Sequence, residues 1–148
     1  MPDIDEHLGP LADFMERGIP FNRHLGMKVA SLSVGACRLE LPFDEVLVGD
    51  PTRPALHGGV ISTLADTAGG LACFSTLESA EDRVSTVDLR VDYLRPAPPQ
   101  TLWCAAHVVR AGNRVAVTRM EVFAGEGEPN ERSEPVATAT GVYNVVRR

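Results

Sequence analysis

The longest run of helically spaced apolar residues extends from His57 to Leu77. A shorter run of the same kind spans residues 4–17, and Gly18 and Pro20 then predict its end. We therefore expect one long helix and a short N-terminal amphipathic helix, with residues 1–20 as a helical extension. The apolar members of the long run recur every three or four residues, as one helix face requires: Val60, Ile61, Leu64, Ala65, Ala68, Leu71 and Ala72.

Shorter stretches alternate apolar and polar residues, which is the two-residue period of a half-buried β-strand. The clearest example runs from Thr86 to Tyr93, where every second residue, beginning with Val87, is apolar. The pair Gly112-Asn113 is a typical hairpin-turn sequence. The other expected strands are Lys28–Ser33, Ala36–Leu41, Thr101–Arg110, Val115–Phe123 and Val136–Val145, with loops at Asp44–Leu56 and Gly125–Glu134.

Together these elements predict an α+β fold, in which one long helix packs on one face of about five to six mostly antiparallel strands. The short connections between the strands favour antiparallel pairing, because parallel neighbours need long crossovers. The 148 residues fit a single domain over residues 1–148, since domains commonly hold roughly 100–150 residues.

The composition of the chain argues against several classes of binding partner. The formal net charge of −6 disfavours nucleic acid, which usually binds a basic surface. No apolar run reaches the ~18 residues of a membrane-spanning helix, and the acidic start MPDIDEHLGP does not resemble a secretory signal. Cys37, Cys73 and Cys104 are odd in number and too widely spaced for a zinc site. We therefore expect free thiols in a cytoplasmic protein that uses no metal or cofactor.

The long helix has an unusual composition on the face opposite its apolar stripe. A solvent-facing side would be rich in Glu, Lys and Arg, whereas this one holds a single charge, Asp66, among small residues. Each helical glycine costs about 1 kcal/mol relative to alanine, so a closely approaching backbone or ligand should compensate. We therefore expect a partner or ligand to cover this face, whose members are Gly59, Ser62, Asp66, Gly69, Gly70 and Cys73.

Three features of this helix have both a structural and a functional interpretation. Asp66 is either a solvated charge or a functional carboxylate, and its small neighbours favour the second. Gly58 and Gly59 either loosen the helix start or expose backbone N–H groups that bind an anion or oxyanion. His57 either caps the helix or takes part in catalysis, and we favour the capping role.

The segment LHGGVISTLADTAGGLA resembles the central-helix signature of the hotdog-fold acyl-CoA thioesterases of the phenylacetate-degradation type. The shared pattern is His-Gly-Gly with an acidic residue nine positions after the histidine, here His57 and Asp66. Downstream, STVDLRVDYLRPA is similar to the long strand that follows the helix in this family. The resemblance covers the chain from Phe21 onward and implies a hotdog fold, with the sheet wrapped around the central helix.

The resemblance also implies roles for individual residues. Asp66 matches the carboxylate that acts as general base or nucleophile, and Gly58 matches the backbone N–H that polarises the thioester carbonyl. Thr86 lies where many members carry a hydroxyl that orients the attacking water. These roles suit the chemistry, because thioester hydrolysis needs a donor for the developing oxyanion and a base that activates water.

The chain departs from the family pattern in the loop before the helix. Many members carry an asparagine six residues before the histidine, where this chain has Pro51. Asp50 is the nearest polar residue and one position out of register. Either Asp50 replaces the asparagine, or Arg53 moves into the space, or the rate of hydrolysis suffers.

The implied substrate is an acyl-CoA with a short-chain, medium-chain or aryl acyl group, so coenzyme A enters only as part of the substrate. Because the net charge is negative, its phosphates need a local arginine cluster. Arg95 is the first candidate, and Arg90 and Arg119 are the others. His57 and Gly59 are expected to line the substrate site beside the thioester.

Two other activities stay open from the sequence. A hotdog hydratase or dehydratase acting on an enoyl or 3-hydroxyacyl thioester pairs a histidine with a carboxylate, so His57 would have to point into the site. A non-catalytic acyl-CoA-binding domain has no reason to hold a lone carboxylate such as Asp66 against an anionic ligand. Thioester hydrolysis is therefore the first hypothesis.

Helix geometry also bears on assembly. Asp66 follows His57 by nine residues, about 13 Å along the axis at 1.5 Å per residue, whereas reacting groups must lie roughly 3–3.5 Å apart. A two-fold dimer with antiparallel helices solves this, and the resemblance implies such a homodimer, often paired again into a tetramer. The active site is then composite, with Gly58 and the Asp50 loop from one subunit and Asp66 and Thr86 from the other.

Overall fold

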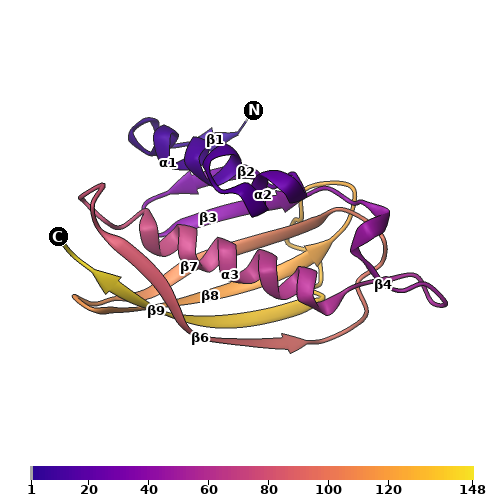
Figure 1. Cartoon of the computed structure of the whole chain (residues 1–148). Coiled ribbons are helices and arrows are strands. Elements are labelled where there is room, and N and C mark those ends of the chain that lie inside the picture. Colours follow the sequence, from indigo (N-terminus) through magenta and orange to yellow (C-terminus); the bar gives the residue numbers. More distant parts are fainter. Residues whose placement is uncertain (1) are drawn as a thin grey trace.

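The central element of the protein is the helix α3 (Gly58–Phe74), which lies against one face of a seven-stranded sheet (Figure 1). The computed structural model describes residues 2–148. Neighbouring strands follow the order β1-β2-β3-β7-β8-β9-β6, and all pairs are antiparallel except the parallel pair of β1 and β2. The strands are β1 (Asp3–Ile4), β2 (Lys28–Ser33), β3 (Ala36–Leu41), β6 (Arg83–Tyr93), β7 (Leu102–Ala111), β8 (Val115–Ala124) and β9 (Ala137–Val146).

This is the α+β arrangement that the sequence predicts. The bounds of β2 and β3 agree with the prediction, and those of β7, β8 and β9 differ by one residue at most at each end. Gly35 turns the chain between β2 and β3 with a φ of 81°, a left-handed conformation that glycine adopts without a Cβ penalty. The seventh strand is the two-residue β1, which is too short to show a period in the sequence.

The segment before α3 is more ordered than the expected loop. It contains a 3-10 turn, η3 (Glu45–Leu47), and two short strands, β4 (Val48–Asp50) and β5 (Ala55–Leu56), which pair with each other. The backbone N–H of His57 donates to the Leu47 carbonyl at 2.8 Å. This hairpin is thereby attached to the start of α3.

The N-terminal extension consists of more than the single helix that the sequence predicts. The turn η1 (Glu6–Leu8), the helix α1 (Gly9–Asp13) and the π-helical turn η2 (Phe14–Gly18) follow one another, and α2 (Pro20–Leu25) comes next. The first helical run ends at Gly18, as expected, and Pro20 also begins the next helix, α2, which was not expected. Proline also suits the first turn of a helix, where its missing N–H is not needed. None of the helices in residues 2–148 is long and apolar enough to cross a membrane.

Side-chain hydrogen bonds attach this extension to the sheet. The buried Asn22 of α2 donates from Nδ2 to the Met15 carbonyl at 3.0 Å. The backbone N–H of Val29 in β2 donates to Glu16 Oε1 at 2.8 Å. Residues 14–25 are thereby held beside the C-terminal half of α3, which becomes important for the site.

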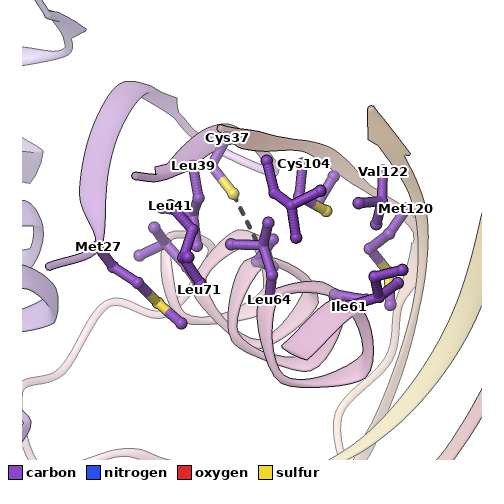
Figure 2. Packing of buried hydrophobic residues seen from close by; sticks show 14 of the residues in the cluster. Met27, Cys37, Leu39, Leu41, Ile61, Leu64, Leu71, Cys104, Met120 and Val122 are labelled. Atoms are coloured by element: carbon purple, nitrogen blue, oxygen red, sulfur yellow. Dashed lines mark hydrogen bonds between the residues drawn. The ribbon is translucent and has the colours of Figure 1, made fainter. Parts of the chain in front are cut away.

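The core lies between α3 and the sheet. Leu64 and Leu71 are fully buried and project from α3 toward side chains of β3, β7 and β8 (Figure 2). Cys37 donates from Sγ to the Ala68 carbonyl at 3.2 Å, the contact dashed in Figure 2. All three cysteines are buried free thiols, and burial raises the pKa of Cys37 to about 12. Cys37 is therefore a packing residue.

A bulge at Val87 breaks the strict alternation of β6. Thr86 and Asp88 pair with consecutive residues of β9, which leaves Val87 between them without a partner in the sheet. Val87 is 64% exposed, whereas Thr86 faces α3 and Leu89 packs against the core. The extra residue thus places both Thr86 and Leu89 on the helix side of the strand.

Candidate active site

Asp66 lies midway along α3, where two strands bring hydroxyl groups to its carboxylate. Thr86 of β6 donates from Oγ1 to Asp66 Oδ1 at 2.8 Å. The Tyr143 hydroxyl of β9 lies 3.2 Å from the same carboxylate oxygen and 3.0 Å from the Asp66 carbonyl oxygen. Within residues 2–148 no side chain hydrogen-bonds to Asp66 Oδ2 and no cation pairs with the carboxylate. Oδ2 is therefore available to water or substrate.

A cavity of about 230 Å³ opens beside this carboxylate. Asp66, Thr86 and Tyr143 line it together with the neutral polar residues Asn22, Thr67 and Ser85, and Asp66 is the only charged residue among those that line it. Such a cavity suits an apolar chain whose reactive end lies at the carboxylate. Its apolar walls come from the N-terminal extension, α3 and β6, through Met15, Ile19, Leu71, Phe74 and Val84.

The first turn of α3 offers one free backbone donor. His57 Nδ1 accepts the Gly59 N–H at 2.8 Å, so His57 has the capping role favoured from the sequence. Of the two donors expected from the glycine pair, only the Gly58 N–H is without an acceptor in residues 2–148. The N-terminus of a helix carries partial positive charge, so this N–H can donate to an oxyanion.

Gly58 and Asp66 do not meet within one chain. They are eight residues apart on a continuous helix, which is about 12 Å along the axis. β6 runs antiparallel along α3 between them, because Thr86 bonds to Asp66 while the Tyr93 hydroxyl donates to the Gly58 carbonyl at 3.0 Å. The oxyanion donor and the carboxylate base of one chain therefore lie at different points along α3.

Part of the small-residue face of α3 is covered by the chain's own sheet. Gly69 and Cys73 are buried against β8 and β9. A Cβ on Gly69 would overlap the Tyr143 hydroxyl and lie 2.7 Å from Thr118 Oγ1. The expectation that a partner or ligand covers this face was therefore wrong for these two residues. The remaining members are at least partly exposed: Gly59, Ser62, Asp66 and Gly70.

Asp50 is engaged within its own loop. Its Oδ1 accepts the Thr52 N–H at 2.9 Å, the Thr52 hydroxyl at 2.6 Å and the Arg53 N–H at 3.2 Å, and Arg53 Nε lies 3.4 Å from Oδ2. These contacts, with the Thr52 hydroxyl as the largest contribution, lower the pKa of Asp50 to about 2. Asp50 therefore stays charged at neutral pH and orders the hairpin at the start of α3, away from Asp66 of the same chain.

The three arginines proposed for the coenzyme phosphates do not form one cluster, because Arg95 lies apart from Arg90 and Arg119, which flank Thr140 of β9 from its two neighbouring strands. Arg95 follows β6 at the end of the molecule where α3 begins, and it forms an ion pair with Glu134. Arg90 and Arg119 lie on the opposite face of the sheet from α3, where Arg90 pairs with Asp92 at 3.2 Å. Of the three, only Arg95 shares an end of the molecule with the start of α3.

Sequence reasoning missed Tyr143 and the N-terminal residues Met15 and Ile19. Tyr143 is 77 positions from Asp66, and no local pattern connects residues so distant. The available signal was chemical, because a tyrosine in a buried strand usually needs a partner for its hydroxyl. Met15 and Ile19 join the cavity only because the N-terminal extension folds back onto α3.

Comparison with known proteins places this geometry in a family. A family model described as the thioesterase superfamily matches residues 54–130, which include α3 and the first part of the sheet that follows. The medium/long-chain acyl-CoA thioesterase YigI of Escherichia coli K12 is 37% identical over 139 residues, covering 86% of each chain. A putative esterase of Halobacterium salinarum is 38% identical over 125 residues, covering 83% of this chain and 82% of its own.

Solved structures agree with the sequence matches. A protein of Shewanella oneidensis related to the thioesterase superfamily superimposes with a TM-score of 0.80 at 32% identity, covering 94% of this chain and 95% of its own. A thioesterase family protein of Silicibacter pomeroyi gives a TM-score of 0.77 at 30% identity, with 88% and 92% coverage. The similarity thus extends over almost the whole fold, including the N-terminal region.

Proposed function

The chain belongs to the thioesterase superfamily and is a thioester hydrolase, and we propose that it hydrolyses medium-chain acyl-CoA esters with Asp66 as the base that activates water. The observation that carries this proposal is the Asp66 carboxylate, held by Thr86 at 2.8 Å beside a cavity with apolar walls. The name of the relative YigI, which refers to medium- and long-chain acyl-CoA, supports the same substrate class. The phenylacetate-degradation subtype and the cytoplasmic location stay predictions.

In the proposed reaction Asp66 Oδ2 takes a proton from water as the water oxygen attacks the thioester carbonyl carbon. The Gly58 N–H of the other subunit donates to the carbonyl oxygen as it gains negative charge, and such a preorganised donor stabilises the transition state. The tetrahedral intermediate then expels the CoA sulfur as thiolate, which takes the proton from Asp66, so that the thiol forms and the carboxylate is restored. The free acid forms as the C–S bond breaks, so no metal or redox group is needed.

The cavity length supports a medium-chain substrate. Asp66, Gly70 and Phe74 line it at successive turns of α3, a distance of about 12 Å. An extended chain of about ten carbons has a similar length, given C–C bonds of ~1.5 Å. In the dimer proposed below, the start of the other subunit's α3 would lie beside Asp66, so the Arg95 next to that helix start is the proposed partner of the coenzyme phosphates.

A homodimer with composite sites is part of the proposal. β6 is the terminal strand of the sheet and has eleven residues, and a long unprotected edge favours pairing with another strand. Exposed apolar side chains accompany this edge, including Val87 at 64%, Tyr93 at 53% and Leu94 at 50%. Pairing two copies here would set their α3 helices antiparallel and bring Gly58 of one subunit to Asp66 of the other. Pairing of dimers into a tetramer stays a prediction.

The hydratase alternative gains no support from the geometry. It requires a histidine beside the carboxylate, whereas His57 is engaged as the cap of α3. An acyl-CoA panel from acetyl to palmitoyl, with phenylacetyl-CoA and crotonyl-CoA, separates the functions by thiol release and by loss of enoyl absorbance. We expect thiol release that peaks at medium chain length. Loss of enoyl absorbance without thiol release would contradict the proposed hydrolysis.

Thr86→Val should lower kcat about 10-fold, because it removes the 2.8 Å hydroxyl donor to Asp66 Oδ1 and leaves the carboxylate less well oriented. Thr86→Ser is the matched control, since it keeps the hydroxyl and should retain most activity. Steady-state thiol release measures both. Equal activity of Thr86→Val and the wild type would remove the hydroxyl from the mechanism.

Gly70→Leu should shorten the usable part of the cavity. Gly70 lines it between Asp66 and Phe74, and a Cβ there meets only Tyr143 Cε1, at 3.6 Å. A larger side chain would therefore project into the space proposed for the acyl chain. Overpacking typically costs 1–3 kcal/mol, so kcat/KM for decanoyl-CoA should fall about 10–100-fold.

Butyryl-CoA provides the internal control for the Gly70 variant. Its shorter acyl chain ends before the blocked part of the cavity, so its kcat/KM should change by less than about 3-fold. Gly70→Ala should give an intermediate loss with decanoyl-CoA. Parallel losses on both substrates would show that the cavity does not hold the acyl chain.

A further inference from the structure

The geometry points to Tyr143 as a positioning residue that orients the Asp66 carboxylate for attack on the thioester, an assignment that rests on the proposed function. Tyr143 belongs to β9 and is 1% exposed. Its hydroxyl lies 3.2 Å from Asp66 Oδ1, on the oxygen that also accepts from Thr86. Two hydroxyl groups from two different strands thus hold one carboxylate oxygen and leave Oδ2 free.

The fold makes room for this contact at two glycines. A Cβ on Gly69 of α3 would overlap the Tyr143 hydroxyl. A Cβ on Gly141 of β9 would lie 2.6 Å from Tyr143 Cε2 and 2.8 Å from its hydroxyl oxygen. A glycine inside a helix costs about 1 kcal/mol of stability relative to alanine. Gly69 therefore lowers the stability of α3 but leaves the space through which Tyr143 reaches Asp66.

The surroundings of the hydroxyl keep it in the donor form. Burial, and then the neighbouring Asp66 carboxylate, raise the pKa of Tyr143, so the phenol stays protonated throughout the working pH range. The Thr118 hydroxyl of β8 lies beside it and donates to Met120 Sδ at 3.2 Å. The other titratable group that faces it is Cys73 of α3, whose own pKa is raised by burial. Tyr143 can therefore act on Asp66 only as a hydrogen-bond donor.

A purely structural role is the competing explanation. The Tyr143 hydroxyl also lies 3.0 Å from the Asp66 backbone carbonyl, and that contact alone would satisfy a buried phenol. Under this explanation, loss of the hydroxyl would lower the melting temperature and leave the chemistry of the carboxylate unchanged. The two explanations therefore differ in kinetic and titration behaviour.

Tyr143→Phe is the direct test, since it removes the hydroxyl and keeps the ring. We expect kcat to fall about 10-fold with KM within a factor of two, because a misdirected carboxylate affects the chemical step. The acid limb of the kcat/KM profile should also move to higher pH. The sign follows because loss of a donor to the charged carboxylate favours its protonated form.

Gly69→Ala tests the same contact from the other side. Its methyl group would push the Tyr143 hydroxyl away from Asp66, so the kinetic changes should resemble those of Tyr143→Phe. Gly9→Ala is the matched control, because a Cβ at Gly9 meets nothing within 4 Å. It should leave kcat, KM and the pH profile unchanged.

Carbon-13 NMR titration of the Asp66 carboxyl group gives a readout that does not depend on activity. Its titration midpoint should move to higher pH in Tyr143→Phe than in the wild type. A wild-type protein that releases no thiol from any acyl-CoA would contradict the proposed function, and the NMR shift would still test the contact. An unchanged midpoint, or wild-type kcat and acid limb in Tyr143→Phe, would overturn the positioning role.

Discussion

Asp66→Asn should remove nearly all thioester hydrolysis while the protein stays folded. General-base catalysis contributes about 10²–10⁴-fold, and an amide cannot take the proton from water. Asparagine also keeps a carbonyl oxygen at the position of Oδ1, so the hydroxyl groups of Thr86 and Tyr143 retain an acceptor. The change therefore removes the base with little disturbance of its surroundings.

The measurement is kcat for thiol release from decanoyl-CoA, with the melting temperature as the test of folding. Asp5→Asn is the matched control, since Asp5 is exposed and its side chain makes no capping hydrogen bond. It should have wild-type kcat. If Asp66→Asn kept more than about a tenth of wild-type kcat, a base contribution of 10²–10⁴ would be untenable.

Periodicity was sufficient to predict the main elements of the fold. The three- to four-residue spacing from Val60 to Ala72 corresponds to the buried stripe of α3, and the alternating segments correspond to the long strands. These patterns are visible in the sequence because a helix or strand that packs against a sheet must bury apolar side chains on one face. The strands β1, β4 and β5 have only two or three residues each, which is too short to show a period in the sequence.

Single-residue irregularities explain most of what the sequence did not predict. The bulge at Val87 leaves no mark on the alternating sequence pattern of β6. It nevertheless places Thr86 on the helix side of the strand. Pro20 is compatible with both the end and the start of a helix, and only the packing of α2 decides between them. Both features depend on tertiary contacts rather than on local preference.

The candidate site was predicted in part. The lone carboxylate and the glycines around it indicated an unusual helix face, and the resemblance supplied Thr86 as its neighbour. The sequence did not show, however, why residue 69 is a glycine: the Tyr143 hydroxyl from the last strand occupies the space that a Cβ would need. His57 shows the converse, because its capping role follows from its place one residue before the helix, where Nδ1 can accept an N–H of the first turn.

The separation of Gly58 from Asp66 leads to the second large effect, which concerns the proposed dimer. If each site takes Gly58 from one subunit and Asp66 from the other, two inactive variants should complement each other. Gly58→Pro removes the N–H donor, and the backbone accommodates it. Proline is favoured at the first helical position, and His57 has the extended φ of −62° and ψ of 132° that a residue before proline requires.

The side chain introduced at Gly58 also has room. A Cβ at this position would lie 3.3 Å from Tyr93 Cε1, so the Tyr93 ring, whose hydroxyl donates to the Gly58 carbonyl, has to shift by a few tenths of an ångström. We therefore expect Gly58→Pro to fold and to be inactive. Asp66→Ala serves as the second parent, and the melting temperature of each parent checks that inactivity reflects the site rather than unfolding.

Co-expression of Gly58→Pro with Asp66→Ala, each carrying a different affinity tag, allows the mixed dimers to be purified. Each mixed dimer contains one doubly damaged site and one intact site, so it should recover about half of wild-type kcat per dimer. An unpurified mixture should recover about a quarter, because random pairing makes about half of the dimers mixed. Purified mixed dimers as inactive as both parents would show that the donor and the base act from the same chain, and the composite site would have to be abandoned.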